Sequence, residues 1–192
     1  MNGKLCGIKV WPGVIGSHRS VGAFGNLIGK ALGKSYIALT NRSDKYCPSH
    51  NFIIVEHGKK LWVGESVHPK ARLVSFAEYE AKLADGKVRN VQLFEVHDVS
   101  KLRQGMAAAW WVGNVLGKKY DWLAFPRLLL KAVFGDRIKR AAGSVWKWWC
   151  TEGIKDAFKK YEGAGYDVYH NENPTPLTTI KRWQEGRLRL LL

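Results

Sequence analysis

The period of hydrophobic and polar positions changes several times along the chain, and each change marks a predicted element. Apolar and polar residues alternate through residues 88–96, which is the pattern of a strand with one buried face. In residues 100–116 the apolar positions recur every three or four residues, which predicts a helix. Ser75 and Glu78 form a capping box, which predicts another helix that ends near Leu83.

Two strand-like runs, residues 51–56 and 61–65, flank the sequence His57-Gly58-Lys59-Lys60 and predict a β-hairpin. If His57-Gly58 forms the turn, Glu65 lies directly opposite His50; if Gly58-Lys59 forms it, Glu65 lies diagonal to His50. Side chains alternate with a period of two, so either turn puts both side chains on one face of the sheet. A loop of odd length would separate them.

Three other segments complete the predicted elements. Residues 6–10 predict a strand, and residues 23–32 predict a short helix within a glycine-rich stretch, residues 13–34. Ser144 is positioned to cap a last helix, which ends near Tyr161. This mixture of strands and helices predicts an α+β fold in which an antiparallel sheet packs against helices.

The length and composition favour one domain without a membrane span. The 192 residues are enough to bury one hydrophobic core, so we expect a single domain over residues 1–192. The sequence has no run of about 18 apolar residues and no apolar signal-peptide core. Its three cysteines are an odd number, which argues against a disulfide framework. We therefore expect a cytoplasmic or phage-associated protein.

The strong positive charge favours anionic partners. The chain has 31 Lys and Arg against 16 Asp and Glu, a formal net charge of +15. Phosphate-bearing cell-envelope polymers and membrane surfaces are the expected partners. Basic and apolar residues alternate most densely in residues 125–142, which fit either a surface-bound amphipathic segment or a core helix with a solvated basic face. No nucleic-acid-binding module is recognisable, so nucleic acid is an unlikely partner.

Two short segments far apart in the sequence carry the candidate chemistry. His50 stands at the start of an apolar, β-branched run, and Cys150 stands at the start of a predicted helix. A thiol and an imidazole are the minimum parts of a thiol nucleophile and its base, and Glu65 is positioned to orient the imidazole. A helix N-terminus lowers the pKa of a thiol, and its N–H groups stabilise an oxyanion. Taken singly, each residue also fits an ordinary place in a hydrophobic core.

A metal site is a weaker interpretation of the same region. Cys47-Pro48-Ser49-His50 has the spacing of a zinc-ligand pair, and Cys6 and His57 are candidate further ligands. Structural zinc sites usually show two such pairs, and the second pair is missing here. We therefore expect neither a metal nor another cofactor.

The order of these segments resembles a known family. Ser49-His50, then strand, turn, strand and Gly64-Glu65-Ser66, resembles the His and Glu segments of the circularly permuted papain-like hydrolases, which are NlpC-type or YiiX-like proteins. Residues 116–122 resemble the family's Gly-Lys-x-Tyr-Asp segment, and residues 149–152 resemble its aromatic-Cys-Ser-Glu motif. Residues 173–177 resemble the proline-containing segment that follows.

The resemblance implies a circularly permuted papain-like fold with Cys150, His50 and Glu65 as the catalytic residues. The sequence departs from the family in three places: Thr151 replaces a serine, Asn51 replaces a small or aliphatic residue, and residues 125–144 resemble an insertion.

The function that the resemblance implies is that of a cysteine peptidase or amidase. Its expected substrate is an amide bond, most plausibly in a peptidoglycan-type peptide. A thiol acyltransferase or esterase that acts on lipid, and a non-catalytic basic binding protein, are the alternatives. The sequence does not choose among them.

Overall fold

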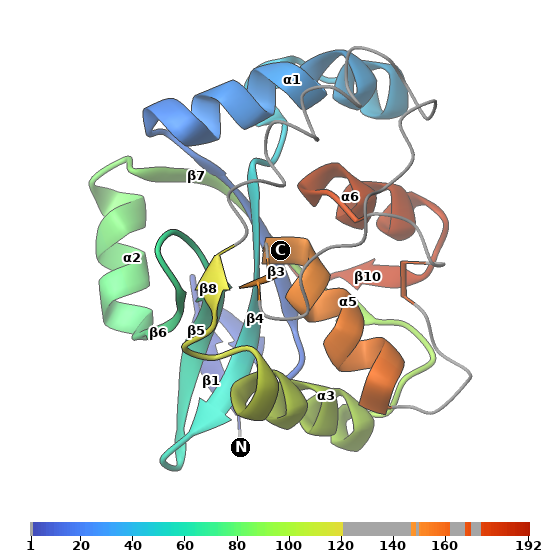
Figure 1. Ribbon diagram of the computed structural model, residues 1–192. Coiled ribbons are helices and arrows are strands. Elements are labelled where there is room, and N and C mark those ends of the chain that lie inside the picture. The colour runs from blue at the N-terminus through green and yellow to red at the C-terminus, as the bar shows by residue number, and fades with distance from the viewer. Residues whose placement is uncertain (1, 121–146, 149, 162–167, 170–173) are drawn as a thin grey trace.

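A six-stranded antiparallel sheet forms the centre of the computed structural model (Figure 1). The structure describes residues 2–120, 147–148, 150–161, 168–169 and 174–192. In spatial order, the strands are β10 (Leu188–Leu190), β7 (Val88–Val96), β3 (Ile15–Ser20), β4 (His50–His57), β5 (Lys60–Ser66) and β6 (Ala71–Val74).

Helices and two small sheets surround this central sheet (Figure 1). The described helices are α1 (Ala23–Thr40), α2 (Phe76–Ala84), α3 (Lys101–Asn114), α5 (Cys150–Tyr161), α6 (Pro176–Gln184) and the short 3-10 helix η1 (Asp44–Tyr46). The small sheets pair β1 (Gly3–Leu5) with β2 (Ile8–Val10), and β8 (Lys119–Tyr120) with β9 (Lys147–Trp148). The fold is therefore α+β, with an antiparallel sheet packed against helices, as predicted.

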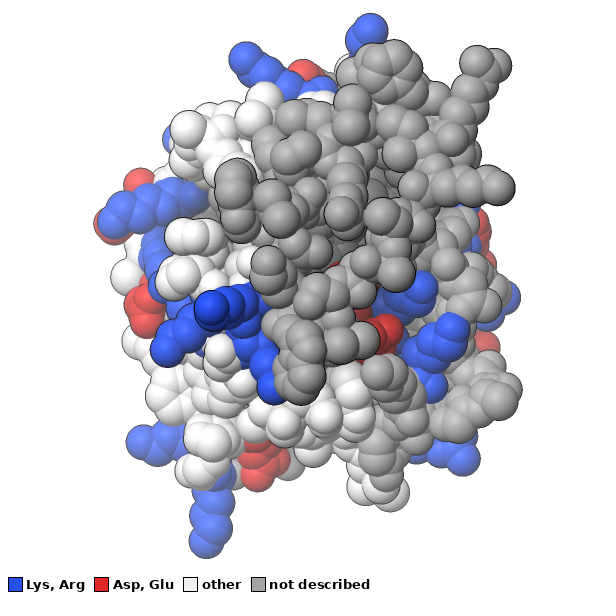
Figure 2. Space-filling model, viewed as in Figure 1, with Lys and Arg blue, Asp and Glu red and all other residues white. Residues whose placement is uncertain are grey.

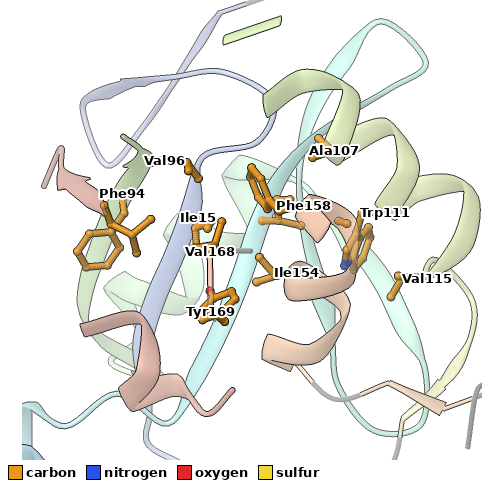
Figure 3. Close-up of a cluster of buried hydrophobic side chains, with 14 of the residues drawn as sticks. Ile15, Phe94, Val96, Ala107, Trp111, Val115, Ile154, Phe158, Val168 and Tyr169 are labelled. Atoms are coloured by element: carbon orange, nitrogen blue, oxygen red, sulfur yellow. The ribbon is translucent and has the colours of Figure 1, made fainter. Parts of the chain in front are cut away.

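Strand β4 is buried on both faces, and this explains its continuous apolar sequence. Ile53 and Val55 belong to a cluster that includes side chains of α3 and α5 (Figure 3). Phe52 and Ile54 belong to a second cluster, which includes Tyr79 of α2 and residues of β1 and β2. Because side chains alternate along a strand, one strand supplies both clusters.

The strongest sequence patterns predicted their elements well. The alternating residues 88–96 form β7, and the helical stripe in residues 100–116 forms α3. Ser75 caps α2 by accepting a hydrogen bond from the backbone N–H of Glu78, and Ser100 caps α3 in the same way. These elements were predictable because their periodicity and their caps are local.

The hairpin that joins β4 and β5 adopts the second of the two predicted turns. His57 pairs with Lys60, so Gly58 and Lys59 form the turn, both with positive φ as a two-residue type I′ turn requires. The alternative turn, His57-Gly58, is wrong. Extending the register beyond the Ile53–Gly64 pair places Glu65 opposite Phe52 and diagonal to His50.

The N-terminal predictions need two corrections. Residues 6–10 are not one strand: Cys6 and Gly7 form the turn between β1 and β2, and both have positive φ. The predicted helix over residues 23–32 is too short, since α1 continues to Thr40. Its glycines are packing positions, not breaks, because a Cβ at Gly29 would collide with the guanidinium of Arg19.

Within the described residues, the last predicted helix is present and begins later than predicted. Helix α5 begins at Cys150, whereas Ser144, its predicted cap, lies outside the described residues. The predicted insertion over residues 125–144, which includes the whole basic segment 125–142, also lies outside them. Among the helices that are described, none is both long and apolar enough to cross a membrane.

Candidate active site

Cys150 and His50 lie together although a hundred positions separate them. Cys150 is the first residue of α5, and His50 is the first residue of β4. Both are buried, and they lie close enough for each to shift the pKa of the other. The two residues that the sequence analysis singled out are therefore brought together by the fold.

The contact favours an ion pair over a neutral thiol and imidazole. Burial is the largest influence on both groups: it lowers the pKa of His50 and raises the pKa of Cys150. Their mutual interaction outweighs burial. The pKa of His50 is thus raised above its ordinary value, and the pKa of Cys150 is lowered below its ordinary value. These two directions favour a thiolate beside an imidazolium.

Glu65 faces the other side of the imidazole. Its Oε2 atom lies 3.6 Å from Nε2 of His50, which is too long for a hydrogen bond. Nε2 is buried and has no hydrogen-bond partner among the described atoms. At this distance Glu65 acts through its charge, which raises the pKa of His50.

The Glu65 carboxylate is held by two cations. Arg72 donates two hydrogen bonds to Oε1 of Glu65, at 2.9 Å from Nε and 2.7 Å from Nη2. Nζ of Lys82 lies 3.9 Å from the same oxygen. Because both cations engage Oε1, Oε2 remains directed at the imidazole.

Asn51, which the sequence analysis noted only as a departure from the family, anchors the start of α5. Its side-chain amide donates hydrogen bonds to the hydroxyl oxygens of Thr151, at 3.1 Å, and of Thr179, at 2.6 Å. Its backbone N–H also hydrogen-bonds Cys150 and contributes to the lowered pKa of that thiol. Two departures from the family, Asn51 and Thr151, are therefore partners of each other.

We expect Asn51→Ala to lower the free energy of unfolding by about 1–3 kcal/mol, because it leaves two buried hydroxyls without their donor. It should also slow alkylation of Cys150, since Thr151 loses its link to β4. Chemical denaturation and labelling rates measure the two effects. Asn114→Ala, at an exposed position of α3, is the matched control. Equal stability of both variants would contradict the anchoring role.

His18 is a buried neighbour of the site that the sequence analysis missed. It lies directly across from His50 on β3, with ring centroids 5.0 Å apart. Its Nδ1 lies 2.8 Å from the hydroxyl of Tyr79, and its Nε2 lies 3.0 Å from the hydroxyl of Ser20. Burial, reinforced by the charges of His50 and Lys82, holds the pKa of His18 well below its ordinary value. His18 is therefore a neutral imidazole beside His50.

A cavity of about 350 Å³ opens on the His50 side of the pair. Its wall combines polar residues of β3, β4 and β5 with residues of α1 and α2. Among the lining residues are His18, His50, Glu65, Arg72, Tyr79 and Lys82. The arrangement thus places a thiol and an imidazole beside a cavity that is lined by both polar and apolar side chains.

The comparisons with known proteins found a similar solved structure. No protein-family model matches the sequence, and no curated protein matches it. The crystal structure of the metalloprotein YiiX from Escherichia coli O157:H7 matches with a TM-score of 0.55, over 95% of this chain and 96% of that one. The fold is similar to that of YiiX. Sequence identity is 18%, so the similarity extends to the fold alone, and the papain-like permutation stays a prediction.

The residues described here do not fit a metal ion. YiiX is described as a metalloprotein. In the described part of this chain, no group of three or more His, Cys, Asp or Glu side chains is placed to hold a metal. Cys47, a candidate ligand in the sequence, is buried, and burial raises its pKa to about 12, which keeps it a neutral thiol.

Proposed function

We propose that this protein is a thiol hydrolase that cleaves an amide bond. Cys150 is the nucleophile, His50 is the general base and acid, and Glu65 stabilises the imidazolium. The observation that carries the proposal is the close, buried pair of Cys150, the first residue of α5, and His50, the first residue of β4. The lowered pKa of the thiol and the raised pKa of the imidazole support it.

The reaction would proceed through an acyl-enzyme. The Cys150 thiolate attacks the carbonyl carbon, and the π electrons move to the oxygen, where N–H groups at the start of α5 stabilise the oxyanion. The imidazolium of His50 gives its proton to the leaving amine as the C–N bond breaks. Water then attacks the thioester while His50 takes its proton, and collapse of that intermediate releases the acid and restores the thiolate.

The substrate that we propose is a peptide of the peptidoglycan type, on the strength of the sequence resemblance. The cavity combines several hydrogen-bonding groups with an apolar wall, which suits a peptide that has both polar and apolar parts. An anionic cell-envelope polymer would also suit a chain with a net charge of +15.

One observation favours a second candidate, a thiol acyltransferase or esterase that acts on lipid. Leu27 and Ile37 of α1 are each 45% exposed, although they are large and apolar. Lys30 and Lys34 are exposed between them, and the helix contains no acidic residue. Such a surface suits an anionic membrane. The same catalytic residues would serve this reaction, with a hydroxyl or amine of another molecule in place of water.

Alkylation with iodoacetamide tests the catalytic pair. The thiolate is the reactive form, and the pKa of Cys150 is lowered whereas the pKa of Cys6 is raised by burial and by Glu80. As pH falls from about 9 to 7, labelling of Cys6 should fall about tenfold per pH unit, while labelling of Cys150 should fall much less. Peptide mass spectrometry measures both rates in one sample. A constant ratio of the two rates would contradict the proposal and favour a non-catalytic binding protein.

A further inference from the structure

The cavity beside His50 carries more positive than negative charge. Among its described lining residues, Arg72, Lys82 and Lys87 are cationic and Glu65 is the one carboxylate. Figure 2 shows the wider setting, a described surface on which basic side chains outnumber acidic ones. A chamber lined in this way attracts an anionic group and raises its local concentration.

The carboxylate of Glu65 does not cancel this charge. It already accepts two hydrogen bonds from Arg72, and it lies 3.9 Å from Lys82. Its Oε2 atom also faces the imidazole of His50. Arg72 and Glu65 thus balance each other, which leaves Lys82 and Lys87 as the cations in excess.

The acidic partners of the two lysines lie outside the cavity lining. Lys82 bonds Glu78 at 2.9 Å, and Lys87 bonds Asp85 at 2.9 Å. Glu78 and Asp85 have side chains 54% and 57% exposed, so water can replace the lysines as their partners. Exposed pairs of this kind contribute little to stability, and a ligand anion can displace them at small cost.

Part of the remaining wall of the cavity is apolar. Ile28, Val67 and Val88 line it, together with Tyr120. The cavity therefore offers cations at the C-terminal end of α2, an apolar wall, and the imidazole of the catalytic pair. Oε1 of Glu65 faces Lys82 and its Oε2 faces His50, so Lys82 and His50 flank the same carboxylate in the cavity wall.

We infer, on the basis of the proposed hydrolase function, that the substrate carries a free anionic group, a carboxylate or a phosphate monoester, next to the bond that is cut. Lys82 and Lys87 bind this group, and the apolar wall receives the part of the substrate between it and the carbonyl. The site thus discriminates against neutral amides of the same shape, because a neutral substrate brings no anion for the two lysines to bind.

Alkylating probes that differ only in charge test this subsite without a known substrate. N-iodoacetylglycine carries a carboxylate, N-iodoacetylglycinamide is its neutral counterpart, and N-iodoacetylaminomethylphosphonate represents the phosphate source. Each rate at Cys150 is divided by the rate of the same probe with free cysteine. We expect the better of the two anionic probes to exceed the amide by about tenfold, the effect of one hydrogen bond to a charged group. The preference should shrink at high salt.

Two double variants test whether the preference for anionic probes comes from Lys82 and Lys87 or from the positive charge of the protein as a whole. In Lys82→Met/Lys87→Met the ratio of the anionic to the neutral rate should fall to within about twofold of unity. Because Lys82 also lies near Glu65, the preference is compared as a ratio, in which any change in Cys150 reactivity common to both probes cancels. Lys4→Met/Lys9→Met removes the same charge from the exposed β1–β2 pair and should keep the preference.

Any other result contradicts a specific part of the proposal. No preference for an anionic probe in the parent protein overturns the subsite. A preference that survives in Lys82→Met/Lys87→Met assigns it to the imidazolium of His50 and also overturns the subsite. If plain iodoacetamide labels Cys150 no faster than Cys6 at neutral pH, the hydrolase proposal itself fails, and the subsite fails with it.

Discussion

Replacing Cys150 with serine should abolish the burst of p-nitrophenolate that the parent protein gives with p-nitrophenyl acetate. The burst reports transfer of the acetyl group to the nucleophile. A serine hydroxyl does not ionise beside His50 as the thiol does, so we expect acylation to slow by on the order of 10⁴-fold or more. The fold should survive, because serine has the same shape as cysteine and its oxygen is smaller than sulfur. Stopped-flow absorbance measures the burst, and thermal melting measures the fold.

His50→Gln should cause a loss of similar size, since the thiol then loses the partner that lowers its pKa. The double variant, Cys150→Ser with His50→Gln, should be no slower than either single variant, because the two residues act as one unit. Cys6→Ser should retain the full burst, with its acetyl group on the peptide that contains Cys150. A burst that persists in Cys150→Ser would place the nucleophile elsewhere.

The sequence predicted the relation between His50 and Glu65 because a hairpin is local. Alternation of side chains and a two-residue turn are enough to put both on one face, and only the choice of turn was open. The contact of Cys150 with His50 is different in kind. It joins α5 to β4 across the fold, and no local pattern in either segment encodes it, so it rested on the resemblance.

The sequence analysis missed His18 because a glycine lies in the strand that carries it. Strand β3, which carries His18, was not predicted because glycine is rare in strands. The structure gives the reason for Gly16: a Cβ there would collide with the ring of Phe52 on β4. Asn51 could not be recognised as an anchor either, because its partners Thr151 and Thr179 are distant in sequence.

Trp111 fills the space between the two halves of the candidate site, so Trp111→Ala should be the most destabilising core substitution. Its side chain is 1% exposed and packs among residues of α3, α5 and the sheet (Figure 3). A Cβ at Gly64 of β5 would lie 2.8 Å from its ring, and a Cβ at Gly153 of α5 would lie 3.1 Å from its Nε1 atom. The ring thus separates the segment of Glu65 from the helix of Cys150.

We expect Trp111→Ala to lower the free energy of unfolding by about 3–5 kcal/mol, since it removes a large buried ring and leaves a cavity. Trp111→Phe should cost less, because its Nε1 has no hydrogen-bond partner among the described atoms and only volume is lost. Leu102→Ala, on the same helix but 75% exposed, should change stability by less than about 0.5 kcal/mol. Denaturant titration measures the change in stability, and the rate of iodoacetamide labelling measures the effect on Cys150. Because α5 rests on this ring, the folded Trp111→Ala protein should also label Cys150 more slowly than the parent. Normal labelling in a strongly destabilised variant would show that Trp111 supports the core without positioning the thiol.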